Sequence, residues 1–122
     1  DTPVRMQVIN SRVLLDSITC DNNPEIVTAL RAYMQKDKNA NRIGEWAIGS
    51  SVDLVQFGFS GSMLQDEKYP GHHVAVGEPC ADETGARWTS KGHLDMVMRD
   101  PTIHLDDIVV MRGGEFTRRF AA

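Results

Sequence analysis

The stretch that decides the fold is IGEWAIG at residues 43–49, a short apolar run with a glycine near each end. Seven residues are too few for a typical helix, and the flanking glycines favour a buried strand. Glu45 is the one charged side chain inside this run. An isolated carboxylate is costly to bury, so we expect Glu45 to have a partner of opposite charge or a bound ion.

Two further apolar runs begin with a residue that can bind a metal. They read HVAVG at residues 73–77 and HLDMVM at residues 93–98. In the second run His93 and Asp95 are two positions apart, so on a strand they project from the same face. An imidazole and a carboxylate together suit zinc, cobalt, manganese or ferrous iron, and do not choose among them.

Each of these groups also has a purely structural interpretation. Glu45 could form an ion pair with Arg87 or Lys91, and His73 could bond a backbone carbonyl. The histidine and aspartate of residues 93–98 could form a simple hydrogen-bonded pair. The residues alone leave the structural and the metal-binding interpretations open.

The remaining chemically notable residues are expected to be structural. His72 adjoins the histidine of the 73–77 run and would point to its opposite side, toward solvent. Trp46 and Trp88 are expected to pack in the core. Cys20 and Cys80 are far apart in sequence and fit neither a dense disulfide framework nor a CxxC zinc motif, so we expect buried thiols.

Turn and capping signals place the other elements. Alternating residues from Val4 and an Asn10-Ser11 turn predict an opening hairpin. Asn22-Asn23-Pro24-Glu25 predicts a helix start, followed by one apolar stripe. The stripe consists of Ile26, Val27, Leu30, Tyr33 and Met34.

The second half of the chain adds a loop and another hairpin. Residues 58–71 predict a glycine-rich loop with a helical turn near residues 65–68, and residues 103–116 predict a hairpin turning at Asp106-Asp107. The expected class is α+β, with a mainly antiparallel or mixed sheet, hairpins at both ends and one main amphipathic helix.

Length and composition limit the number of domains and the classes of partner that this chain can have. With 122 residues, 41% of them hydrophobic and 25% charged, the chain predicts a single folded domain over residues 1–122. A net charge of −4 disfavours nucleic acid as a partner. No apolar run approaches the roughly 20 residues of a membrane helix, and no signal peptide is evident, which predicts the cytoplasm. The sequence opens at Asp1 without an initiator Met, so a preceding segment is possible.

Four motifs in order carry a resemblance to a known family. They are RIGEWAIG at residues 42–49, LQDEK at 64–68, HVAVG at 73–77 and HLD at 93–95. Their order resembles the C-terminal part of the M29 family of thermophilic metallo-aminopeptidases, which also includes 2,5-dihydroxypyridine dioxygenases. The resemblance runs from the opening hairpin to the final strand.

The resemblance implies a site and an activity. Glu45, His73, His93 and Asp95 match metal-ligand positions of the aminopeptidases, with Glu45 as ligand or proton shuttle. The implied function is a hydrolase that uses water activated by zinc, cobalt or manganese on an N-terminal peptide or amide bond. Two alternatives stay open: a ring-cleaving dioxygenase with ferrous iron on His73, His93 and Asp95, and a non-catalytic assembly domain.

The chain also departs from the family. The aminopeptidases have a tyrosine seven residues after the first of these histidines, where this sequence has Cys80, and this weakens the peptidase prediction. A further glutamate ligand and the N-terminal domain of the family lie upstream of the matched part. The resemblance therefore implies the C-terminal metal-binding portion of a longer enzyme, whose partners are its own N-terminal part, a small peptide or small-molecule substrate, and a second copy.

Overall fold

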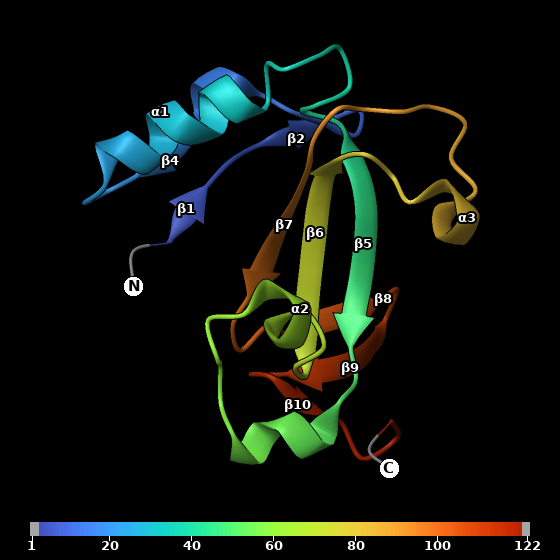
Figure 1. The fold of residues 1–122 in the computed structure, drawn as a ribbon. Coiled ribbons are helices and arrows are strands. Elements are labelled where there is room, and N and C mark those ends of the chain that lie inside the picture. Colours follow the sequence, from blue (N-terminus) through green and yellow to red (C-terminus); the bar gives the residue numbers. More distant parts are fainter. Residues whose placement is uncertain (1–2, 121–122) are drawn as a thin grey trace. The chain divides into compact units, whose positions relative to one another are not determined.

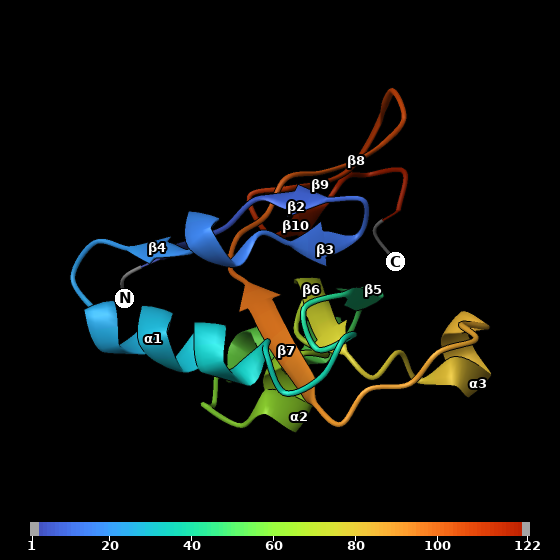
Figure 2. The same cartoon turned by 90° about the horizontal axis from the view of Figure 1, so that it is seen from above.

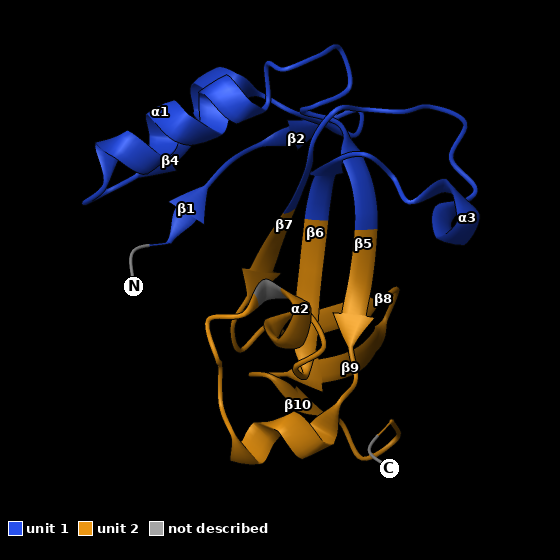
Figure 3. Ribbon diagram, viewed as in Figure 1, with its two compact units in different colours: residues 1–45, 75–94 blue, residues 46–74, 95–122 orange. Residues whose placement is uncertain are grey.

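The computed structural model describes residues 3–120, except for the side chain of Met63. The chain groups into two compact units (Figure 3). Unit 1 consists of residues 1–45 and 75–94, and unit 2 of residues 46–74 and 95–122. This grouping does not test whether the units fold separately, so a single domain stays a prediction.

The fold class is α+β, as the sequence predicts. Within residues 3–120, α1 is the only helix of more than five residues, and the strands form small sheets ordered β1-β4, β2-β3, β5-β6-β7 and β10-β9-β8 (Figures 1 and 2). Arrows of neighbouring strands in β5-β6-β7 point in opposite directions in Figure 1, so the strands of this sheet are antiparallel.

The elements are β1 (Val4–Arg5), β2 (Val8–Ile9), β3 (Arg12–Val13), η1 (Leu15–Ser17), β4 (Thr19–Cys20), α1 (Pro24–Tyr33), β5 (Ile43–Gly49), η2 (Val52–Gln56), α2 (Met63–Asp66), β6 (Gly71–Gly77), α3 (Ala81–Thr84), β7 (His93–Met98), β8 (Ile103–Leu105), β9 (Ile108–Arg112) and β10 (Glu115–Phe116).

The opening hairpin of unit 1 is confirmed, and its turn explains its register. Asn10 and Ser11 have φ values of 50° and 59°, the two positive angles of a tight hairpin turn between β2 and β3. Val4–Arg5 pairs instead with Thr19–Cys20, a longer-range pairing that the local alternation does not predict.

Helix α1 begins where its capping residues predict. The Asn23 side chain accepts a hydrogen bond from the backbone N–H of Ile26 at 3.1 Å, and Pro24 occupies the first helical turn. Four residues of the predicted stripe are half-buried or buried, whereas Ile26 is exposed. α1 packs on β4, and the Arg31 guanidinium donates to the carbonyl of Leu15 at 2.9 Å. The helix is thereby fixed to the core of unit 1, which contains Val13, Ile18, Met34, Ala40, Ala75, Val76 and Pro79.

Strand β5 occupies its predicted residues, but most of it is half-buried and not buried as the sequence predicts. The Trp46 side chain is 49% exposed. Within unit 2 the ring of Trp46 lies 5.8 Å from that of His72, centroid to centroid. Trp46 therefore covers a neighbouring side chain at the surface, and its predicted place in the core is wrong.

Unit 2 has its own apolar core at the C-terminal sheet. Ile103, Val110 and Met111 are buried there, with Ile48 and Phe116 packed against them. The hairpin between β8 and β9 turns at the predicted residues, and Asp106 has a φ of 53°.

The helices of unit 2 are short. Helix α2 starts at Met63, two residues before its predicted position, and the 3-10 helix η2 was not predicted. None of the helices within residues 3–120 combines the length and apolar character needed to cross a membrane.

Candidate metal centre

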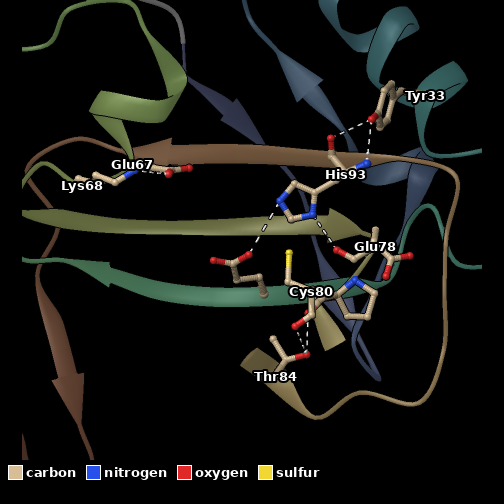
Figure 4. A network of polar contacts seen from close by, with 9 residues as sticks. Tyr33, Glu67, Lys68, Glu78, Cys80, Thr84 and His93 are labelled. Carbon is tan, nitrogen blue, oxygen red and sulfur yellow. Dashed lines mark hydrogen bonds and ion pairs between the residues drawn. The ribbon is translucent and has the colours of Figure 1, made fainter. Parts of the chain in front are cut away.

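His93, the first residue of β7, has a ring geometry typical of metal-binding histidines. Its Nδ1 lies 2.7 Å from the backbone carbonyl of Glu78, and its Nε2 lies 3.9 Å from Oε2 of Glu45 (Figure 4). A carbonyl oxygen can only accept, so Nδ1 carries a proton and donates it. In the neutral ring, Nε2 then presents its lone pair toward the Glu45 carboxylate. Metal-bound histidines are commonly oriented by such a bond to a carbonyl.

Tyr33 at the end of α1 fixes the backbone of His93. Its hydroxyl accepts from the His93 N–H at 3.0 Å and donates to the His93 carbonyl at 2.9 Å. Gly92 makes this approach possible, because a Cβ at that position would come within 3.0 Å of the Tyr33 ring. The imidazole is therefore anchored through both its ring and its backbone.

The loop before β7 is held by Asp37. The Asp37 carboxylate accepts from the Lys91 N–H at 2.6 Å, the Asn39 N–H at 2.8 Å and the Ser90 hydroxyl at 3.0 Å. These bonds, led by the one from Lys91, hold the pKa of Asp37 below its usual range. The residues immediately before His93 are thereby tied to the segment that follows α1.

Glu45 reaches His93 because the backbone of unit 1 is closely packed beside it. A Cβ on Gly44 would lie 2.7 Å from the carbonyl of Gly77, so only glycine allows this approach without a shift. The Gly77 N–H bonds the carbonyl of Arg42 at 2.9 Å. The Glu45 side chain is 18% exposed and that of His93 is 29% exposed, which leaves the pair reachable from solvent.

Cys80 joins this pair, which sequence reasoning missed. Ligand atoms of Glu45, Cys80 and His93 all lie within 4.8 Å of one another, and all three residues belong to unit 1. Cys80 is only half-buried, and neither it nor Cys20 forms a disulfide. The expectation of a buried thiol is therefore wrong, because Cys80 is half-buried. The signal that could have found it is its position in the resemblance, where the family has a tyrosine near the metals.

The other two predicted ligands lie in unit 2. His73 on β6 is 7% exposed, Asp95 on β7 is half-buried, and their ligand atoms come within 4.8 Å of each other. The structure thus brings the four predicted ligands together as two pairs, Glu45 with His93 in unit 1 and His73 with Asp95 in unit 2. Their convergence on one site stays a prediction.

His72 departs from its predicted role. The residue is half-buried, and its Nδ1 is buried without a hydrogen-bond partner among residues 3–120. Burial, and to a smaller extent the neighbouring His73, lower the pKa of His72. The prediction that this ring faces solvent is wrong because the ring packs near Trp46 instead.

The donor set of unit 1 fits a transition-metal ion. Zinc binds thiolate, imidazole and carboxylate at about 2.0 to 2.3 Å, which places neighbouring ligand atoms roughly 3.3 to 3.8 Å apart. The observed 3.9 Å between His93 and Glu45 is close to this spacing and too long for a direct hydrogen bond. The spacing of these two atoms is therefore compatible with one ion bound by both.

Comparisons with known proteins add no relative to this picture. No family model, no curated protein and no solved structure matches the chain.

Proposed function

We propose that this protein is a metal-dependent hydrolase of the M29 aminopeptidase type, acting on an N-terminal peptide or related amide bond. Glu45, His73, His93 and Asp95 are its proposed ligands, and zinc, cobalt or manganese its ions. The observation that carries the proposal is the orientation of His93, whose Nδ1 donates to Glu78 while Nε2 faces the Glu45 carboxylate. We further propose a cytoplasmic homo-oligomer that works with an N-terminal portion of the same enzyme.

A divalent ion held by the proposed ligands would supply an activated water and polarise the scissile carbonyl. The chain's own residues orient the reaction. The Glu78 carbonyl keeps His93 in one tautomer, and Tyr33 keeps its backbone in place. Glu45 would act as a ligand or, alternatively, as a proton shuttle, in which case its partly exposed carboxylate would take a proton from water and return it to the leaving amine.

A hydrolysis assay tests this proposal. The full-length enzyme, with its N-terminal portion, is supplied in turn with zinc, cobalt and manganese and given aminoacyl substrates, and release of the free amino acid is measured. Glu45→Gln should lower the rate at least about 100-fold, the usual scale of a lost acid–base group. Glu115→Gln, an exposed position on β10, is the matched control and should retain full activity. Absence of hydrolysis with every ion, or an unchanged rate in Glu45→Gln, would overturn the proposal.

A second candidate is a ferrous ring-cleaving dioxygenase of the same family. Two histidines and one carboxylate form the ligand set that non-haem iron oxygenases use. The proximity of His73 and Asp95, and Cys80 in place of the family's tyrosine, favour this candidate. Oxygen uptake on adding a dihydroxypyridine to the protein loaded anaerobically with iron would support it. Absence of uptake, together with amino-acid release in the hydrolysis assay, would exclude it.

A further inference from the structure

Cys80 has a backbone conformation that a cysteine rarely adopts. Its φ is 48° and its ψ 63°, the left-handed region in which glycine, asparagine and aspartate are common and other residues are not. Such a conformation costs on the order of 1 kcal/mol or more, so it persists only where the surroundings enforce it.

The surroundings of Cys80 do enforce it. Pro79 before it is fully buried, and its carbonyl accepts from the Thr84 hydroxyl at 2.6 Å. The carbonyl of Cys80 accepts from the N–H of Glu83 at 2.8 Å and from that of Thr84 at 3.1 Å. The backbone is thus fixed on both sides of the cysteine, which sets the direction in which its Cβ leaves the chain.

The Cys80 side chain points toward His93. Figure 4 shows the Cys80 sulfur directed at the imidazole of His93. Its sulfur lies within 4.8 Å of the ligand atoms of Glu45 and His93. A thiol that loses its proton would add a second negative charge next to the Glu45 carboxylate.

Beside the Glu45 carboxylate, a thiolate would be favoured only with a cation nearby, because a neighbouring like charge otherwise keeps the thiol protonated. A thiolate, an imidazole and a carboxylate are together a ligand set for zinc, whereas magnesium and calcium select oxygen ligands. Thiolate also disfavours manganese, which prefers oxygen donors.

We propose that Cys80 is a third protein ligand, as thiolate, of an ion held by Glu45 and His93, and that it makes this centre selective for zinc or cobalt. The thiol releases its proton to solvent as the metal–sulfur bond forms. This inference rests on the metal centre proposed above and is independent of which reaction that centre catalyses.

Cobalt spectroscopy tests the inference directly, because a cobalt–thiolate bond gives an intense near-ultraviolet charge-transfer band that oxygen and nitrogen ligands do not give. The protein is titrated with Co²⁺ as wild type, Cys80→Ser and Cys20→Ser. Cys20 on β4 is the only other cysteine and provides the matched control. The wild type and Cys20→Ser should show the band, and Cys80→Ser should lack it and bind zinc at least about tenfold more weakly.

A thiol-alkylation experiment gives a second readout without any activity assay. Zinc should slow the reaction of iodoacetamide with Cys80 and leave its reaction with Cys20 unchanged, as followed by peptide mass spectrometry. Far-ultraviolet circular dichroism of Cys80→Ser, expected to match the wild type, separates ligand loss from misfolding.

The outcomes distinguish the two proposals. Cobalt bound without the band, or alkylation of Cys80 unaffected by zinc that is bound, would overturn the role of Cys80 and leave the metal centre standing. If neither cobalt nor zinc binds the wild type, both proposals fail.

Discussion

His93 is restrained at its ring and at its backbone, and its backbone restraint depends on one hydroxyl. Tyr33 both donates to and accepts from the His93 peptide groups, across sixty positions of sequence. Removing the hydroxyl leaves a partly buried N–H and carbonyl without these bonds, which is costlier than losing an exposed pair.

We therefore expect Tyr33→Phe to lower the free energy of unfolding by about 1 to 3 kcal/mol, measured by urea denaturation. The His93 amide should also exchange its hydrogen faster. Tyr69→Phe, at the chain's other tyrosine, keeps the ring stacked on Phe59 at 4.4 Å and should leave the His93 amide unchanged. Equal exchange of that amide in wild type and Tyr33→Phe would contradict the anchoring role.

Asp37 makes stability depend on pH in a defined direction. Its hydrogen bonds lower its folded pKa, so the stabilisation is complete above the unfolded pKa, about 3.9, and is lost as pH falls through the folded value. In Asp37→Asn, which cannot ionise, this contribution is absent.

The difference in unfolding free energy between wild type and Asp37→Asn should therefore be constant near neutral pH and shrink below about pH 4. Thermal unfolding at a series of pH values measures it. Asp21→Asn is the control, because its ion pair with Arg5 is exposed on both sides and should matter little at any pH. A difference that stays constant down to pH 2 would show that the Asp37 carboxylate is not held as described.

At the scale of elements, the end of β6 depends on a glycine that no other residue can replace. Gly77 has a φ of 99°, and a Cβ there would collide with the carbonyl of Gly92. Gly85, at the end of α3, also has a positive φ of 69°, but nothing lies within 4 Å of its missing Cβ. Comparing the same substitution at Gly77 and Gly85 therefore distinguishes the stability cost of backbone strain from that of a steric collision.

Gly77→Ala should cost about 3 kcal/mol or more of unfolding free energy, since it adds a collision to backbone strain. Gly85→Ala should cost only about 1 to 2 kcal/mol, from the strain alone. Chemical denaturation of both variants checks the difference. Equal losses would mean that β6 and the residue before β7 do not approach each other as closely as the structure shows.

The sequence predicts the elements that local chemistry determines. The Asn10-Ser11 turn, the Asn23 cap of α1 and the turn at Asp106 were all found from residue types with strong backbone preferences. The pairing of β1 with β4, and the exposure of Trp46, were not. Both depend on contacts distant in sequence, which no local pattern encodes.

The residues of the candidate site also fall into two groups, those predicted from the sequence and those seen only in the structure. Glu45 and His93 were predicted because a charged or imidazole group in an apolar strand stands out, and the structure places them 3.9 Å apart. Cys80 lies in a loop without any local pattern, and its proximity to His93 is seen in the structure, where its backbone is left-handed and its sulfur points toward that ring.

At the scale of the whole molecule, each compact unit contains one pair of the predicted ligands. Unit 1 holds Glu45 and His93 with Cys80, and unit 2 holds His73 and Asp95. If the alternative of a non-catalytic assembly domain holds, the protein should retain no metal. A metal centre predicts the opposite, because an ion that binds the folded state selectively stays with it through purification.

The most direct test of the central claim is the metal content of the purified protein, measured by elemental analysis without chelator. We expect a transition-metal ion, zinc or cobalt if Cys80 is a ligand as proposed, in about stoichiometric amount in the wild type and in His104→Ala, a variant at an exposed histidine on β8. His93→Ala should lose the metal because it removes the oriented nitrogen. Metal absent from the wild type, or retained in full by His93→Ala, would contradict a centre built on Glu45 and His93.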